Sequence, residues 1–199
     1  ATIQLSDFST FNILDSPFFF KSMSKLQFPK GFLWGAASSA HQVEGNTHND
    51  WSEWEKSHAE QLAREAYTKF GHIKYWERLR PEAENPQNYI SGLACDHYRR
   101  FREDFDIAKS LHHNAHRFSI EWSRIEPEEG KFDEAAIAHY REVLYALRER
   151  GMEPFVTLWH WTLPLWLRDK GGVASKEFPV FFERYTRFVV SKLDDQVTF

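Results

Sequence analysis

Two short apolar runs, Asn-Ala-His-Arg-Phe-Ser-Ile at residues 114–120 and Pro-Phe-Val-Thr-Leu at residues 154–158, decide the fold of this chain. Between them, apolar side chains recur at spacings of three and four positions over residues 137–147, which is typical of an amphipathic helix. Asp133 is placed to cap the first turn of that helix, and Gly151 is placed to end it. A strand, a helix and a second strand in this order predict a βαβ unit with parallel strands.

The same alternation continues on both sides of this unit. Residues 32–37, Phe-Leu-Trp-Gly-Ala-Ala, predict an earlier strand that is buried on both sides. Residues 94–111 predict a helix with one apolar face. That face consists of Tyr98, Phe101, Phe105, Ala108 and Leu111. A further helix begins near Pro179 and residues 197–199 predict the opening of another strand, so the fold class is α/β with about three βα units plus the start of the fourth strand.

Two segments fall outside this alternation. Residues 46–93 are long, polar and aromatic, and we expect an ordered excursion with helical pieces rather than a separate domain. Residues 1–24 match no structural pattern, and we expect a leader or an appended remnant that is poorly ordered. The domain is therefore predicted to cover residues 25–199.

Composition limits the possible functions. The chain has 199 residues, of which 42% are hydrophobic and 27% are charged, so it can bury a real core. The net charge of -4 gives no basic surface for nucleic acid or for an anionic membrane. No apolar run approaches the roughly 20 residues that cross a bilayer. Cys95 is the only cysteine and cannot form an internal disulfide, which favours a reducing compartment, and we expect the cytoplasm.

Three motifs resemble segments of one enzyme family. They are Gln-Val-Glu-Gly at residues 42–45, Arg-Phe-Ser-Ile-Glu-Trp-Ser-Arg at residues 117–124 and Leu-Trp-His-Trp-Thr-Leu-Pro at residues 158–164. In combination they resemble the substrate-facing strand ends of family 1 glycoside hydrolases, and the resemblance extends over about residues 28–199. It implies a TIM (β/α)8 barrel that hydrolyses β-glucosides or β-galactosides with retention and without a cofactor. Such a barrel needs roughly 250 residues, so this chain is expected to form the N-terminal part of one.

The resemblance also assigns roles to individual residues. It implies that Gln42 and His160 bind sugar hydroxyls and that Trp161 lines the same subsite. Amide and imidazole groups suit this task because each can both donate and accept a hydrogen bond. Arg117 is expected to support a nucleophilic glutamate that lies beyond this chain. The general acid/base would also follow residue 199, so no catalytic residue is expected here and the chain alone is predicted to be inactive.

Other interpretations of these residues stay open. Gln42 can be a loop residue that bonds only to its own turn. Arg117 can form a buried ion pair with Glu44 or Glu121, since an arginine in an apolar strand needs a partner. Glu44 is expected to be structural, holding backbone amides or pairing with an arginine. Thr162 stands where many family members have an aspartate, and we interpret it as subfamily variation.

The sequence offers weaker signals as well. The tryptophans of the excursion, Trp51, Trp54 and Trp76, can border an outer sugar subsite. Three histidines lie close together at positions 112, 113 and 116, but the first two fall near a predicted helix end and no carboxylate or cysteine spacing completes a metal site. We therefore predict no metal.

Three hypotheses follow. In the first, the chain is one piece of a β-glycosidase that acts on a β-glycoside or oligosaccharide, with a companion chain that supplies the rest of the barrel. In the second, it is a noncatalytic sugar-binding or oligomerising half-barrel fragment that self-associates through open strand edges. In the third, it is a different enzyme that uses Glu121, Glu126 or Glu128, although these three are expected to be surface or ion-pair residues.

Overall fold

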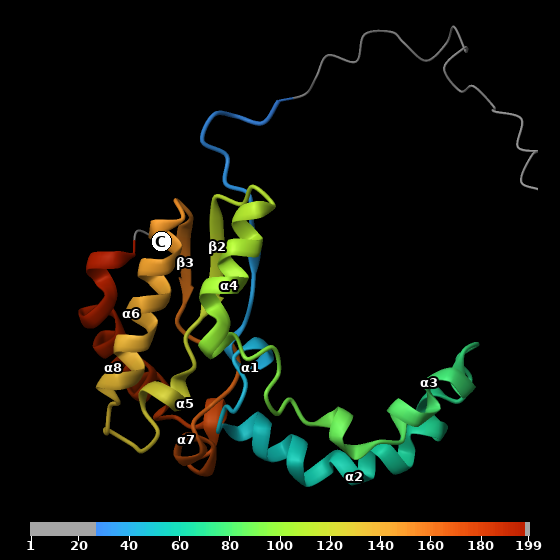
Figure 1. Cartoon of the computed structure of the whole chain (residues 1–199). Coiled ribbons are helices and arrows are strands. Elements are labelled where there is room, and N and C mark those ends of the chain that lie inside the picture. Colours follow the sequence, from blue (N-terminus) through green and yellow to red (C-terminus); the bar gives the residue numbers. More distant parts are fainter. Residues whose placement is uncertain (1–26, 198–199) are drawn as a thin grey trace, which may run out of the picture. The chain divides into compact units, whose positions relative to one another are not determined.

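The computed structural model describes residues 27–197 of the chain (Figure 1). The chain divides into two compact units, residues 1–32 and residues 33–199. In the described part of the first unit, the Phe32 amide donates to the Pro29 carbonyl, and the Phe28 and Phe32 rings lie 4.6 Å apart. The predicted leader at residues 1–24 lies outside the described residues.

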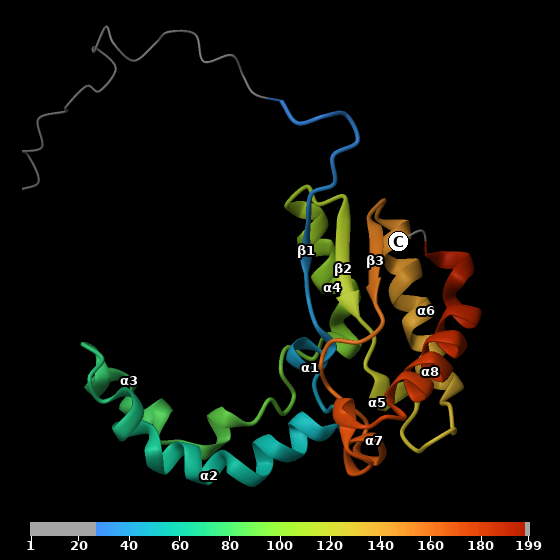
Figure 2. The same cartoon turned by 180° about the vertical axis from the view of Figure 1, so that it is seen from behind.

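The second unit is built on a parallel sheet of three strands, in the order β1-β2-β3. The strands are β1 (Gly35–Ala37), β2 (Ala115–Ser119) and β3 (Glu153–Thr157). Gly35 is level with Ala115, and Ala115 is level with Glu153, so the strands begin together. The view from behind shows the strands in front of the helices that cover the other face of the sheet (Figure 2). The α/β class with three βα units is thereby confirmed.

Three long helices alternate with these strands. They are α4 (His97–Ser110), α6 (Glu134–Glu149) and α8 (Phe178–Leu193). Their apolar faces form one core with the buried side of the strands, in which Trp122 is 1% exposed and stacks on Tyr185 at 4.5 Å. Asp133 caps α6 by accepting from the amides of Ala135 and Ala136, as its position in the sequence predicts.

A short helix follows each strand at its carboxyl end. These helices are α1 (Ala40–Val43), α5 (Trp122–Ile125) and α7 (Leu165–Asp169). Two 3-10 turns lie after α7, η3 (Gly172–Ala174) and η4 (Asp194–Gln196). Because the carboxyl ends of parallel strands meet at one edge of a sheet, the segments that begin these helices come together there.

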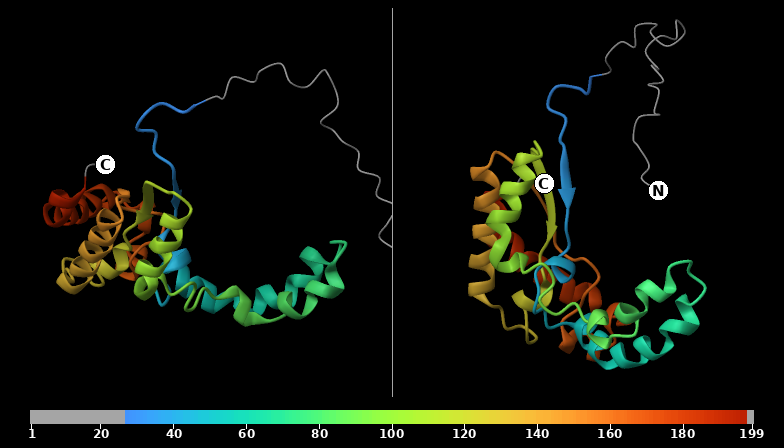
Figure 3. Two further views of the ribbon diagram at one scale, coloured as in Figure 1. Left: turned by 45° about the horizontal axis from the view of Figure 1, so that its top comes forward. Right: turned by 45° about the vertical axis from the view of Figure 1, so that its right-hand side comes forward.

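The excursion between β1 and α4 is more regular than the sequence indicates. It contains α2 (Asp50–Phe70), α3 (Trp76–Ala83) and the 3-10 turn η2 (Pro86–Tyr89). Asn49 begins α2 with a reciprocal cap, in which its side chain accepts from the Ser52 amide while the Ser52 hydroxyl accepts from the Asn49 amide. Figure 3 shows α2 and α3 extending away from the sheet.

Two predictions about the elements are wrong. The first strand covers only residues 35–37, and all three are exposed rather than buried on both sides, because within residues 27–197 β1 is an edge strand that pairs with β2 alone. Leu111 is 64% exposed, since α4 ends at Ser110 before the apolar stripe is complete. The predicted fourth strand falls largely on residues 198 and 199, outside the described residues.

Candidate functional site

The carboxyl ends of the three strands gather the segments that the sequence analysis singled out. Gln42 lies in α1, after β1. Arg117 lies in β2. His160 and Trp161 follow β3 and precede α7. The sheet thus brings residues that are 118 positions apart, such as Gln42 and His160, to one edge of the molecule.

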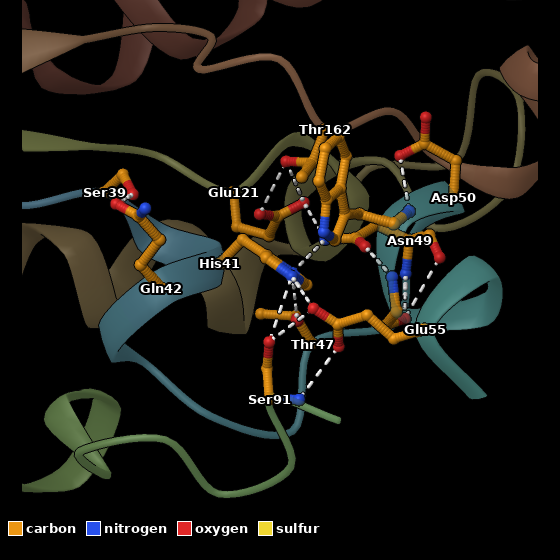
Figure 4. Close-up of polar contacts among 12 residues, drawn as sticks. Ser39, His41, Gln42, Thr47, Asn49, Asp50, Glu55, Ser91, Glu121 and Thr162 are labelled. Atoms are coloured by element: carbon orange, nitrogen blue, oxygen red, sulfur yellow. Dashed lines mark hydrogen bonds and ion pairs between the residues drawn. The ribbon is translucent and has the colours of Figure 1, made fainter. Parts of the chain in front are cut away.

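The Gln42 side chain is exposed and makes one hydrogen bond within residues 27–197. Its Oε1 atom accepts from the Ser39 hydroxyl at 2.5 Å (Figure 4). This is the contact with its own turn that the sequence analysis kept as an alternative to sugar binding. The side-chain nitrogen Nε2 of Gln42 donates no hydrogen bond in the described part of the chain, so this exposed side chain keeps a donor for a ligand.

Trp161 has the most unusual backbone at this edge. Its φ angle is +76°, which is an outlier for a bulky residue, and its side chain is 73% exposed. The Thr162 amide donates to the His160 carbonyl at 3.1 Å, so the chain forms a three-residue turn centred on Trp161. A backbone held in such a region costs about 1–3 kcal/mol and persists only where the surrounding structure imposes it.

The loop around this turn is backed by the core. The Trp159 indole donates to the Thr162 carbonyl at 3.0 Å, and its ring lies 5.9 Å from that of Trp161. Tyr185 of α8 donates its hydroxyl to the Leu158 carbonyl at 2.6 Å. His160 is half-buried, and the backbone on both sides of it is held by these two hydrogen bonds.

Arg117 does not form the ion pair that the sequence left open. Within residues 27–197 its guanidinium makes one hydrogen bond, from Nη1 to the Ser38 carbonyl at 3.4 Å, and it pairs with neither Glu44 nor Glu121. Both carboxylates have other partners, as described below. Arg117 alternates along β2 with Phe118, which belongs to the core, so the half-buried guanidinium lies on the face opposite the helices.

Glu44 is structural, as expected. Arg124 donates from Nε to the Glu44 carboxylate at 2.8 Å and from Nη2 to the Gly45 carbonyl at 2.6 Å. The Tyr140 hydroxyl donates to the other Glu44 oxygen at 2.8 Å. Burial raises the pKa of Glu44 to about 7, against the opposing charge of Arg124. Glu44 is therefore committed to holding α1 against α5 and α6.

A buried polar network beside Gln42 was missed by the sequence analysis (Figure 4). His41 is 8% exposed and contacts Thr47 Oγ1 at 3.0 Å through Nδ1 and Glu55 Oε1 at 3.1 Å through Nε2. Ser91 donates its hydroxyl to the same Glu55 oxygen at 2.6 Å. The network fastens the excursion to α1. The only local sequence pattern that could have indicated it is the helix cap formed by Asn49 and Ser52.

The expectation that Glu121, Glu126 and Glu128 are surface or ion-pair residues holds for Glu126 and Glu128 and is wrong for Glu121. Glu121 is 1% and Glu126 is 0% exposed. Glu126 pairs with Arg184 and accepts from the Trp122 indole at 2.9 Å, so it is an ion-pair residue. Glu121 accepts only from uncharged donors within residues 27–197. Of the three glutamates named for a different enzyme, only Glu128 is exposed, and it pairs with Lys131.

Glu44 and Glu121 are not arranged for acid/base work on a sugar at this edge. Retaining glycosidases need two carboxylates about 5–5.5 Å apart that reach the sugar. Glu44 and Glu121 are buried and occupied by donors from the protein itself. The groups that reach solvent are the amide of Gln42, the imidazole of His160 and the indole of Trp161, which suit sugar hydroxyls and the apolar face of a pyranose ring.

The tryptophans of the excursion differ in exposure. Trp51 and Trp54 are about half exposed and line a hollow with Arg168, whereas Trp76 is 4% exposed and cannot border a sugar subsite. Within residues 27–197, no three histidine, cysteine, aspartate or glutamate side chains are arranged to hold a metal ion. No helix in this part of the chain is long and apolar enough to cross a membrane.

Comparison with known proteins gives a consistent result. The model of glycosyl hydrolase family 1 matches residues 24–199. β-Glucosidase A of Thermotoga maritima is 34% identical over 177 residues, which cover 88% of this chain and 35% of the relative. The chain thus spans about a third of the length of the curated relatives that it matches.

Solved structures agree with this match. The crystal structure of the β-glycosidase BGL167 is 42% identical with a TM-score of 0.66, and the match covers 85% of this chain and 35% of that one. A β-glucosidase of Thermotoga maritima in complex with castanospermine is 33% identical with a TM-score of 0.64, again covering 85% of this chain and 35% of the other. At these identities the likeness extends beyond the fold.

Proposed function

Since the chain belongs to glycosyl hydrolase family 1, we propose that it forms the sugar-binding N-terminal part of a retaining β-glycosidase barrel that hydrolyses β-glucosides or β-galactosides. Gln42 and His160 bind sugar hydroxyls in this proposal, and Trp161 stacks on the ring. Arg117 supports the nucleophile. The general acid/base and the nucleophile, both glutamates, come from outside residues 1–199, so this chain alone does not hydrolyse glycosides.

The observation that carries the proposal is the turn at Trp161. A large aromatic side chain that is 73% exposed on a strained backbone is costly, and strain of this kind gathers at functional sites. The turn follows a strand at its carboxyl end, where barrel enzymes hold their substrates. His160 precedes Trp161 directly, so a hydrogen-bonding group and a stacking surface are presented together.

The remaining strands of the barrel are supplied by further polypeptide, either a companion chain or a longer protein of which this sequence is a piece. The open elements of the described chain support this part of the proposal. β1 is exposed along its whole length. An apolar hollow of about 250 Å³ also lies beside β3, lined by Val156, Leu158, Val189, Val190, Leu193, Asp194 and Val197.

The same open elements favour a second candidate, a noncatalytic sugar-binding fragment that associates with itself. Native mass spectrometry distinguishes the two. A complex with a different polypeptide that restores hydrolysis of a chromogenic β-glucoside supports the first candidate. Multiples of this chain alone, which bind sugar without turnover, support the second.

Sugar binding by this chain is testable directly. Titration with castanospermine, followed by tryptophan fluorescence, should give saturable binding that His160→Ala and Trp161→Ala each weaken about 10-fold or more, since each removes a hydrogen bond or a stacking face. His72→Ala is the matched control, because His72 is exposed on the excursion away from the strand ends. Equal affinity for His160→Ala and His72→Ala would rule out the proposed role of His160.

A further inference from the structure

The loop that carries His160 and Trp161 is anchored at the two residues that follow it. Thr162 donates its hydroxyl to the Glu121 carboxylate, at 3.0 Å from Oε2 and 3.2 Å from Oε1 (Figure 4). The Leu163 amide donates to Asp50 Oδ1 at 2.7 Å, and the Asp50 amide donates to the Leu163 carbonyl at 3.0 Å. The strained turn at Trp161 therefore leads directly into two successive fixed residues.

Glu121 joins this loop to two other segments. Besides the bonds from Thr162, its Oε1 atom accepts from the Ser123 hydroxyl at 2.8 Å and from the Asn49 side-chain amide at 3.2 Å. Asn49 is the cap of α2, and Ser123 lies in α5. A buried carboxylate is stable only when hydrogen bonds replace its water, so each of these donors is held firmly in return.

These contacts have a mechanical consequence for the turn. The Thr162 amide closes the turn by its bond to the His160 carbonyl, while the Thr162 hydroxyl is fixed on Glu121. If that hydroxyl were released, the backbone at Trp161 could relax from its positive φ angle and the side chain would lose its fixed direction. Thr162 would then be held only through its backbone, by the Trp159 indole on its carbonyl and by the contacts of Leu163 that follow it.

We propose that Glu121 is a positioning residue, which acts through Thr162 to hold the turn that presents His160 and Trp161 to the sugar. The reference to sugar rests on the proposed function, whereas the anchoring of the turn does not. Glu121 reaches no substrate itself, since it is 1% exposed. The proposal also gives Thr162 a role beyond filling space.

Three variants of the full chain test this proposal. Thr162→Val removes the hydroxyl and keeps the shape, Thr162→Ser keeps the hydroxyl, and Ser123→Ala removes a different donor from the same carboxylate outside the loop. Hydrogen exchange at the amides of Thr162 and Leu163 reports the turn, and castanospermine affinity reports its use. Thr162→Val should raise both amide exchange rates and the Kd about 10-fold, the effect of one lost hydrogen bond to a buried acceptor.

The matched variants decide the interpretation. Thr162→Ser should stay within about threefold of the parent in both measurements, and Ser123→Ala should lower stability without speeding exchange in the loop. If Thr162→Val behaves as Ser123→Ala does, the hydroxyl only satisfies a buried carboxylate and the proposal fails. If the parent binds no castanospermine, the proposed sugar binding fails instead, and the exchange rates still decide whether Glu121 holds the turn.

Discussion

Replacing Arg124 by methionine should lower the free energy of unfolding by about 3–5 kcal/mol, because it leaves a buried carboxylate without its cation. Glu44 is 5% exposed and has Arg124 as its only cationic partner within residues 27–197. The variant also loses the hydrogen bond to the Gly45 carbonyl and the stacking of the guanidinium on Tyr98, at 4.1 Å from the ring centre. Urea unfolding at neutral pH measures the loss.

The matched control is Arg102→Met, which removes an exposed arginine that pairs with Glu142 and Glu149. Exposed pairs contribute about 0–1 kcal/mol, so this variant should be nearly as stable as the parent. The double variant Glu44→Gln with Arg124→Met should recover part of the loss, since glutamine can still accept from Tyr140. Similar losses for Arg124→Met and Arg102→Met would show that Glu44 is solvated.

The pH dependence of the Arg124 variant follows from the raised pKa of Glu44. Burial raises this pKa from its ordinary value of 4.5 to about 7, so the folded protein binds this proton more tightly than the unfolded chain does. The contribution of Glu44 to stability is therefore complete below about pH 4.5 and is lost as the pH rises through 7. Removing Arg124 takes away the largest effect that lowers the pKa, so the variant should lose stability more steeply than the parent between pH 6 and 8.

Gly45→Ala should destabilise the protein by about 2–5 kcal/mol, the sum of a left-handed backbone and an overpacked contact. Gly45 has φ +80°, and a Cβ atom there would lie 2.0 Å from the Leu93 carbonyl oxygen and 2.6 Å from its carbon. These are backbone atoms that cannot turn aside. The contact lies where the excursion returns to α1, so either the excursion or the segment that carries Gln42 must move.

Gly130→Ala separates the cost of the left-handed backbone from the cost of the overpacked contact. Gly130 has a similar φ of +73°, but nothing lies within 4 Å of the position of its Cβ atom. This variant should therefore lose only the conformational part, about 1–2 kcal/mol. Thermal or urea unfolding of both variants measures the difference, and equal losses would show that Leu93 does not pack against Gly45 in solution.

The parts of the fold that were predictable have local signals. The runs at residues 114–120 and 154–158 are apolar enough to require burial, and Asp133 with the stripe that follows it marks α6 without reference to distant residues. The length of α2 was not predicted, because its buried face has no large apolar side chain to form a periodic stripe. That face consists of Ser52, Glu55, Ala59, Ala63 and Ala66. The exposure of β1 depends on its place at the edge of the sheet. The pattern of apolar residues in the sequence does not show where in a sheet a strand lies.

Some features of the candidate site could be predicted from the sequence, and others could not. Gln42, His160 and Trp161 were identified by the motifs that surround them, and the structure places all three after strand ends. The burial of Glu121 could not be predicted, since two of its three side-chain donors, Asn49 and Thr162, lie far away in the sequence. The positive φ angle of Trp161 is likewise imposed by tertiary contacts, because nothing in the local sequence favours a left-handed tryptophan.

The central claim, that this chain supplies a working sugar site to a β-glycosidase barrel, is tested most directly by a chimera. In it, residues 24–199 replace the matching segment of Thermotoga maritima β-glucosidase A, and hydrolysis of 4-nitrophenyl β-glucoside is measured. We predict a folded chimera that hydrolyses the glucoside, and a His160→Ala chimera that unfolds at the same temperature but is about 10–100-fold less active. A chimera that folds cooperatively and shows no hydrolysis would contradict the claim.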